Sequence, residues 1–375
     1  MIRINVGVIG CGNISAIYLS NLSKFPNVRV LACADIDIER AKARAVEFNV
    51  KKACSVEELL QDEEIQLVVN LTIPQAHAEV CLRALEAGKH VHVEKPLATD
   101  TASARQIESV ATARNLRVGV APDTFLGAGL QTTRKILDDG WIGRPVAATA
   151  FMMSHGHERW HPDPAFFYQK GGGPMYDMGP YYLTAFVHLL GPANRVTAST
   201  QTSFPERTIL SEQKRGEKIQ VEVPTHIAGI VDFECGAVAT LVTSFDVWHA
   251  ELPRIEIYGT EGTISVPDPN TFGGPVRVRR YDANEWIEMP LTHGFSENSR
   301  GLAVADMADA IMKDRPHRAS LEQGLHVLEM MEGFHTASTQ NRHVELAYKC
   351  QRAEPLPVGF SLDNFFSTSQ IAILS

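Results

Sequence analysis

Three groups of residues in this chain of 375 residues could take part in catalysis. The first is Glu94-Lys95-Pro96, which follows the apolar residues Val91 and Val93 at the end of a predicted strand. A lysine at the edge of a sheet can bond a reacting hydroxyl, and burial lowers its pKa toward the range that suits proton transfer. Glu94 is expected to orient the lysine or a ribose of a cofactor. Position alone leaves open a structural role, because most lysines lie on the surface.

The second group lies in the segment GGGPMYDMGPYY, residues 171–182, and consists of Asp177 and Tyr181. These two residues are four apart and share one face if the segment is a single helix. Asp177 can steady a substrate hydroxyl, and it can equally cap a helix. Tyr181 can take part in proton transfer, and it can equally pack in the core with its hydroxyl satisfied.

The third group is the polar and aromatic segment HGHERWHPD, residues 155–163. Such a segment suits sugar binding, because Trp160 can stack on a ring while His155, Arg159 and His161 bond its hydroxyls. An ordinary loop would show the same composition. Several histidines also suggest a metal, but no acidic cluster completes a known ligand spacing, so we expect no metal.

The start of the chain predicts a cofactor site that could serve these three groups. A β-branched strand runs into Gly10 and Gly12, and a helical pattern begins after Asn13 and Ile14. Gly10 allows the sharp turn, Gly12 lets a phosphate approach the backbone, and the helix start directs free N–H groups at that phosphate. Ser15 takes the last position of the usual GxGxx(G/A) fingerprint and is small enough for close packing. We therefore expect a dinucleotide site.

A second buried strand ends at Asp35, about 25 residues after Gly10, where an acidic side chain commonly meets the adenosine ribose. A carboxylate accepts bonds from both ribose hydroxyls and repels a 2′-phosphate, which favours NAD over NADP. Arg40 is close enough in sequence to reach a 2′-phosphate, so NADP is the less expected cofactor. The alternative role of Asp35 as a helix cap fits Asp37 better.

The elements that position these residues fall into two parts. Strands alternate with helices up to about residue 123, which predicts a doubly wound parallel sheet of the Rossmann type over residues 1–123. Longer strands without helices between them follow, and they predict an open, mostly antiparallel sheet in residues 124–375. Helices Pro180–Leu190, Gly301–Lys313 and Leu321–Gln340 are expected to cover one of its faces. The other face needs a cover, which predicts a homodimer or homotetramer.

Composition excludes several classes of protein. The formal net charge is −9, and no run of Lys and Arg is long enough to predict nucleic-acid binding. The six cysteines are scattered without a CxxC pair, which predicts free thiols in a reducing compartment. We find no signal peptide and no apolar run long enough to cross a membrane, so a cytoplasmic protein without membrane contact is expected.

Taken in order, these motifs resemble the glucose–fructose oxidoreductase / inositol 2-dehydrogenase / rhizopine catabolism (Gfo/Idh/MocA) family. The resemblance extends from Val6 to about Met331. It implies an N-terminal Rossmann domain, a C-terminal open sheet used for contacts between subunits, and NAD(P)-linked chemistry at a secondary alcohol of a sugar or cyclitol. The motifs that carry it are the glycine fingerprint, Asp35, the Thr72, Pro74 and His77 pattern, AGKHVHVEKPLA at Ala87–Ala98, and GGGPMYDMG at Gly171–Gly179.

The resemblance also implies roles for particular residues. Lys95 corresponds to the catalytic lysine and Asp177 to its acidic partner, while Thr72, Pro74, His77 and Glu94 line the cofactor site. The family usually carries DxGxHxxD, and here Tyr181 and Thr184 replace its histidine and second aspartate. Asp123-Thr124 replaces a segment that more often contains arginine, and Asp123 is expected to face the substrate.

Three functions follow from these residues. The leading one is an NAD-dependent dehydrogenase of a sugar, glycoside or cyclitol, with Lys95 and Tyr181 handling the hydroxyl proton. Which of the two is the base stays open, because a tyrosine is a good base only if a neighbouring cation stabilises its phenolate. The second is an NADPH-linked reductase of a sugar ketone, enone or imine. The third, of another class, is a non-catalytic dinucleotide-sensing regulator, which the missing histidine favours and the intact Lys95 and Asp177 oppose.

Overall fold

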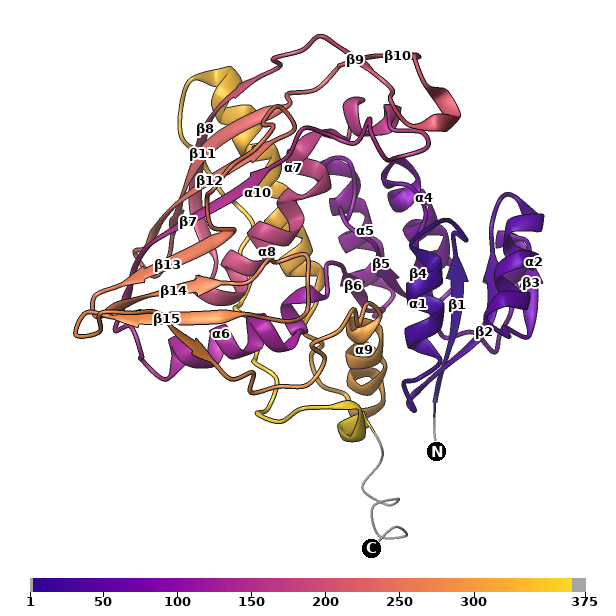
Figure 1. Cartoon of the computed structure of the whole chain (residues 1–375). Helices are drawn as coiled ribbons and strands as arrows, with labels where there is room; N and C mark the ends of the chain where they lie inside the picture. The colour runs from indigo at the N-terminus through magenta and orange to yellow at the C-terminus, as the bar shows by residue number, and fades with distance from the viewer. Residues whose placement is uncertain (1–2, 366–375) are drawn as a thin grey trace, which may run out of the picture. The chain divides into compact units, whose positions relative to one another are not determined.

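The computed structural model describes residues 3–365, which form two compact units (Figure 1). The first unit contains the chain up to Gln131, then Thr292–Leu325 and the segment from Ala353 onward, and the second contains Thr132–Leu291 and His326–Arg352. This division differs from the single boundary expected at residue 123, because helix α9 (Leu302–Lys313) returns to pack on the first unit. Residues 366–375 lie outside the described part of the expected C-terminal domain. That residues 124–375 bind substrate and form oligomer contacts stays a prediction.

The first unit is built on a six-stranded parallel sheet with strand order β3-β2-β1-β4-β5-β6, which confirms the predicted doubly wound architecture. Its strands read as nearly continuous apolar runs because both faces are covered. The strands are β1 (Ile4–Ile9), β2 (Val28–Ala34), β3 (Lys52–Cys54), β4 (Leu67–Asn70), β5 (His90–Val93) and β6 (Val118–Val120). The helices are α1 (Ser15–Leu22), α2 (Ile38–Glu47), α3 (Val56–Gln61), α4 (Pro74–Glu86), α5 (Thr101–Ala113) and α9.

Side-chain caps fix where several of these helices begin. Ser55 and Glu58 form the reciprocal capping box at α3, and the Asp37 carboxylate accepts the Glu39 N–H at α2. Asp100 caps α5 in the same way, by accepting the Ser103 N–H. Asp37 therefore takes the capping role, which leaves Asp35 to other partners.

The strand order of the first sheet reverses between β1 and β4, and ligands of such sheets bind at the carboxyl ends of the strands at this point. Gly10 follows β1, Asp35 follows β2 and Thr72 follows β4. Glu94 follows β5 and Asp123 follows β6. The topology thus brings the glycine loop and four polar residues, from five separate segments, to one edge of the sheet.

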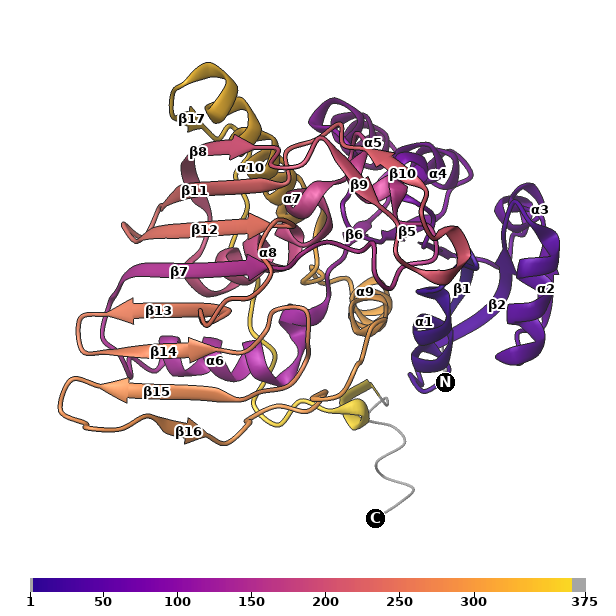
Figure 2. The ribbon, with the colours of Figure 1, turned by 45° about the horizontal axis from the view of Figure 1, so that its top comes forward.

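The second unit is built on a nine-stranded sheet with order β16-β15-β14-β13-β7-β12-β11-β8-β17, as Figure 2 shows. All neighbouring strands are antiparallel except β7 and β12, which confirms the predicted mostly antiparallel sheet. The strands are β7 (Pro145–Met153), β8 (Ala193–Gln201), β11 (His226–Phe233), β12 (Val238–Ser244), β13 (Ile255–Gly259), β14 (Gly262–Val266), β15 (Val276–Arg280), β16 (Ile287–Met289) and β17 (Val344–Glu345), with a separate ribbon of β9 (Glu206–Thr208) and β10 (Lys218–Gln220).

Helices cover one face of this sheet (Figures 1 and 2). They are α6 (Ala128–Asp138), α7 (Gly173–Asp177), α8 (Gly179–Leu190) and α10 (Leu321–Gln340). Every residue of α8 is buried, and Phe186 on α8 meets Phe233 of β11 edge to face. A side chain at Gly229 of β11 would collide with Phe334 on α10, which shows how closely that helix lies on the sheet. Every second side chain of β11 and of the first part of β12 lies on the opposite face and is less buried. Ile230 and Val238 are exposed there.

No helix within residues 3–365 combines the length and the apolar character that crossing a bilayer would require.

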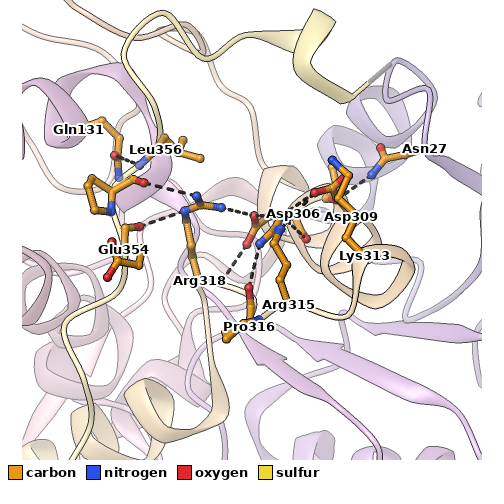
Figure 3. Close-up of polar contacts among 12 residues, drawn as sticks. Asn27, Gln131, Asp306, Asp309, Lys313, Arg315, Pro316, Arg318, Glu354 and Leu356 are labelled. Carbon is orange, nitrogen blue, oxygen red and sulfur yellow. Dashed lines mark hydrogen bonds and ion pairs between the residues drawn. The ribbon is translucent and has the colours of Figure 1, made fainter. Parts of the chain in front are cut away.

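A buried carboxylate holds the returning segments of the first unit together (Figure 3). Asp306 on α9 is almost completely buried, and its Oδ1 accepts bonds from Arg315 at 2.8 Å and Arg318 at 2.5 Å. Arg318 also donates to the carbonyls of residues 354 and 355 at 3.0 and 3.3 Å. The Leu356 N–H donates to Gln131 Oε1 at 2.7 Å, so the segment 354–356 is held from two sides.

We expect Asp306→Ala to lower the free energy of unfolding by about 3 kcal/mol, because two partly buried guanidinium groups lose their acceptor. Urea unfolding at neutral pH measures this loss. The matched control is Asp314→Ala, which removes an exposed partner of Arg117 and should cost less than about 1 kcal/mol. Equal small losses in both variants would show that the Asp306 network contributes no more than a surface ion pair.

Candidate functional site

The glycine loop after β1 has the geometry that a dinucleotide phosphate requires. Gly10 has φ of +98°, and a Cβ there would lie 2.6 Å from the backbone carbonyl group that follows β4. A Cβ on Gly12 would meet nothing within 4 Å, so open space adjoins the loop where a phosphate would lie. Asn13 and Ile14 form the turn into α1, whose N-cap position Ile14 makes no side-chain cap, and Ser15 Oγ donates to Gly12 O at 2.7 Å. These residues therefore fit a dinucleotide.

Asp35 is buried and held by two backbone amides. Its Oδ2 accepts the Cys11 N–H at 2.8 Å, and its Oδ1 accepts the Asp37 N–H at 2.9 Å. The exposed Arg40 guanidinium is 3.9 Å from Asp35 Oδ1, and Arg44 donates to the glycine loop at 3.2 Å. Each carboxylate oxygen keeps a second lone pair, so Asp35 can still accept bonds from ribose hydroxyls.

Two apolar residues at the same sheet edge were missed by the sequence reasoning. Ile36 is 95% exposed directly after Asp35, and Ile73 is 61% exposed directly after Thr72. Large apolar side chains with this exposure beside a polar strand end are candidates for contact with a flat ring. The signal in the sequence is weak, because each is a single isoleucine in a connection.

His77, expected to contact the cofactor, lies between the segments that follow β4 and β5 and within hydrogen-bond distance of both. It is buried, and its Nδ1 lies 2.6 Å from Pro96 O while Nε2 lies 3.1 Å from Thr72 O. Burial lowers the pKa of His77, so the neutral ring donates to one of these carbonyls. Thr72 Oγ1 donates to the buried Asn70 Oδ1 at 2.7 Å, and Pro74 is the first residue of α4. Cofactor contact by Thr72, Pro74 and His77 stays a prediction.

Glu94 links the segment around Lys95 to the first helix. Its Oε1 accepts the Tyr18 hydroxyl at 2.8 Å, and its Oε2 accepts the backbone N–H of Lys95 at 2.9 Å. Tyr18 lies fully buried on α1, and burial raises its pKa well above the usual value. Glu94 thus positions Lys95 through the backbone, and Lys95 itself is half-buried at the carboxyl end of β5.

Asp123, expected to face the substrate, has a structural contact instead. Its Oδ2 accepts the backbone N–H groups of Gly301 at 2.8 Å and Ala303 at 3.2 Å, at the start of α9. The residue is buried, and burial raises the pKa of its carboxyl to about 6. This partner lies far along the chain, so no local pattern could reveal it, and substrate contact by Asp123 stays a prediction.

In the second unit, Asp177 is paired with a histidine that the sequence reasoning did not assign. Asp177 Oδ2 lies 3.2 Å from His157 Nε2, and both side chains are largely buried. The His157 ring stacks on Phe167 with centroids 3.8 Å apart and planes 8° apart. The only sequence signal for His157 is its place in the polar segment 155–163.

Asp177 and Tyr181 lie on two successive helices, which agrees with the helix predicted to begin at Pro180. Asp177 is the last residue of α7, and Tyr181 lies buried in the first turn of α8. Pro180 lacks an N–H group and cannot continue the bonding of the preceding helix, so a new helix begins there. Whether Tyr181 acts in catalysis stays a prediction.

The other predicted sugar-binding residues differ in what they can reach. The His155 ring stacks on Trp248 with centroids 3.4 Å apart, and the Arg159 guanidinium lies 4.9 Å from the same ring. Burial lowers the pKa of His161, which is half-buried. Trp160 is 63% exposed and is therefore the aromatic side chain in this segment best able to stack on a ligand.

A cavity of about 220 Å³ lies beside these residues within the second unit. Its lining includes His157, Trp160 and Met178, together with Arg254 and Asp268, which lie 3.3 Å apart. The cavity adjoins Asp177, because His157 contacts Asp177 and Met178 follows it directly in the chain. Within residues 3–365, no cluster of three or more His, Cys, Asp or Glu side chains could hold a metal ion.

The sheet order and the glycine loop are those of a dinucleotide-binding Rossmann unit, and the family model that matches this unit is that of an oxidoreductase family. The family model described as "Oxidoreductase family, NAD-binding Rossmann fold" matches residues 4–121, and the "GFO/IDH/MocA C-terminal domain" model matches residues 130–265. The chain belongs to the Gfo/Idh/MocA family.

Several relatives are named for activities on sugars or cyclitols. The 1,5-anhydro-D-fructose reductase of Ensifer adhaerens is 28% identical over 69% of this chain and 74% of that protein. The inositol 2-dehydrogenase 3 of Saccharopolyspora erythraea is 27% identical over 76% of this chain and 79% of that protein. Levoglucosan dehydrogenase in complex with NADH and levoglucosan has a TM-score of 0.78 at 21% identity, over 92% of this chain and 100% of that chain, which shows a common fold.

Proposed function

We propose that this protein is an NAD-dependent dehydrogenase that transfers a hydride between nicotinamide and a secondary alcohol of a sugar, glycoside or cyclitol. The observation that carries the proposal is the half-buried Lys95 at the carboxyl end of β5, held through Glu94 to the helix that begins at the glycine loop. A lysine fixed there is placed to exchange a proton with a substrate hydroxyl. The sugar and cyclitol activities of the relatives agree with this substrate class.

Each part of the cofactor has a suitable partner among the residues of the first unit. The space beside Gly12 and the start of α1 suit the pyrophosphate, and Asp35 suits the adenosine ribose. Ile36 and Ile73 offer apolar surface to the adenine ring. When bound, the nicotinamide supplies the acceptor for the hydride.

The remaining steps are proton transfer and substrate binding. We assign the base to Lys95, because Tyr181 is buried on α8 and a tyrosine removes a proton poorly near neutral pH. Asp177 accepts a hydrogen bond from a substrate hydroxyl, and Trp160 stacks on the ring. The reverse reaction, reduction of a sugar ketone, is the second candidate, since one relative is an anhydrofructose reductase.

The open face of the nine-stranded sheet supports a homo-oligomer. Ile230 on β11 and Val238 on β12 are 42% and 43% exposed, and the half-buried Phe151 and Val242 share the face. Exposed apolar side chains on adjoining strands favour burial against another subunit. We propose a homodimer or homotetramer formed through this face.

For the cofactor, we expect Asp35→Asn to lower the ratio of the NADPH to the NADH dissociation constant by about tenfold or more. The variant loses the charge that repels a 2′-phosphate. Fluorescence titration with NADH and NADPH gives both dissociation constants. Glu39→Gln is the control, since that exposed carboxylate on α2 pairs with Lys42, and it should leave the ratio unchanged. Tighter binding of NADPH by the unmodified protein would contradict the assignment of Asp35.

For the reaction, we expect Lys95→Ala to lower turnover by about 10²- to 10⁴-fold while NAD binding stays nearly unchanged. NADH absorbance with a panel of sugars and cyclitols measures turnover, and the exposed Lys313→Ala is the control. Near-normal turnover in Lys95→Ala would make the lysine structural. Binding of NAD without turnover of any substrate by the unmodified protein would favour the regulator instead.

For the assembly, we expect the double variant Ile230→Glu, Val238→Glu to sediment as a monomer of 41.3 kDa at micromolar concentration. Two carboxylates in a buried interface lose hydration that nothing replaces. The control is Val46→Glu on α2, an exposed apolar residue of the first unit, which should leave the assembly intact. A 41.3 kDa monomer for the unmodified protein would overturn the proposal.

A further inference from the structure

The imidazole beside Asp177 comes from a different part of the chain than the family pattern suggests. The pattern places a histidine four residues after the aspartate, where this chain has Tyr181. In the structure, His157 approaches Asp177 instead, with 3.2 Å between Nε2 and Oδ2. The two side chains come from separate segments of the second unit, the loop after β7 and the end of α7.

Hydrogen bonding determines which nitrogen of His157 carries the proton. Nδ1 is buried and has no hydrogen-bond partner within the described residues 3–365. A proton on Nδ1 would bury an unsatisfied donor and turn a lone pair of Nε2 toward the carboxylate. The favourable tautomer therefore has its proton on Nε2, which donates to Asp177.

The ring is fixed independently of this bond. It stacks on Phe167 and meets Phe245 edge to face at 4.8 Å between centroids. The backbone N–H of His157 donates to the buried Tyr168 hydroxyl at 3.3 Å. Gly156 has φ of +79°, and a Cβ there would collide with the Tyr168 hydroxyl and with Glu158, so the turn that directs His157 requires glycine.

We propose that His157 is the positioning residue of Asp177: its Nε2–H keeps the carboxylate ionised and turned toward the substrate hydroxyl. This inference rests on the proposed function, because it assigns the substrate contact to Asp177. A hydrogen bond to the charged form of a carboxyl lowers its pKa. His157 itself transfers no proton in this role, and it supplies the imidazole that position 181 lacks.

Other charged groups near His157 are paired among themselves or are weaker partners. The buried Arg207 binds Glu158 at 3.0 Å and also binds Asp246, and Arg254 lies 3.3 Å from Asp268. Among the described residues, His161 and Tyr168 are further titratable neighbours of His157, and His161 also lies near Asp177. Asp177 is therefore the carboxyl group whose protonation should depend most on His157.

Two substitutions separate the N–H donor from the ring. His157→Phe keeps a flat ring for Phe167 and removes the donor, whereas His157→Gln places an amide N–H near the position of Nε2–H. We expect His157→Phe to lower kcat/KM by about 10- to 100-fold with NADH affinity unchanged, and His157→Gln to recover most of the loss. Loss of the donor raises the pKa of Asp177, so the acidic limb of the pH profile moves to higher pH in His157→Phe. A purely structural role would leave that limb in place.

A second measurement needs no substrate. Carboxyl ¹³C NMR of the full-length protein, assigned with Asp177→Asn, should show the Asp177 midpoint rising by more than about half a pH unit in His157→Phe and by less in His157→Gln. Equal midpoints in all three folded proteins overturn the inference, whether or not the enzyme is active. A shifted midpoint in a protein that turns over no sugar or cyclitol supports the bond and contradicts the proposed function. If His157→Phe fails to fold, the midpoint of His157→Asn, which has no donor at the Nε2 position, decides in its place.

Discussion

The first unit depends on the close approach of two backbone segments at Gly10. The φ angle of Gly10 is positive, and a Cβ at this position would lie 2.6 Å from the chain after β4, so glycine alone fits there. Near this approach, the N–H after Gly10 donates to Asp35. The His77 ring lies within hydrogen-bond distance of the carbonyls of Thr72 and Pro96. Asp35, the glycine loop and the segment of Lys95 are thus parts of one connected set of short contacts.

Local patterns were sufficient to predict much of this fold. The alternation of strands and helices predicted the parallel sheet, and the apolar period of Leu321–Gln340 predicted α10 with the bounds that the structure shows. The cap at Asp37 was recognisable because both partners lie within one turn of a helix. The short strand β3 was missed, since three residues carry too little periodicity.

Contacts between distant segments explain what the sequence did not reveal. The hydrogen-bond partners of Asp123 are backbone amides at the start of α9, far along the chain. His157 resembles a loop residue until α7 brings Asp177 to it. In both cases the deciding partner is far away in sequence, and hydrophobic periodicity does not reveal such a contact.

The central claim, hydride transfer to a nicotinamide, is tested most directly by following the hydrogen. The protein is incubated with NAD and a panel of sugars and cyclitols, including levoglucosan and inositol, that carry deuterium on their carbinol carbons. Mass spectrometry of the recovered cofactor reports the label. The account predicts reduced cofactor that carries one deuterium, together with an oxidised carbonyl product and a released proton. Cofactor that binds to the protein but gains no deuterium from any member of the panel would contradict it.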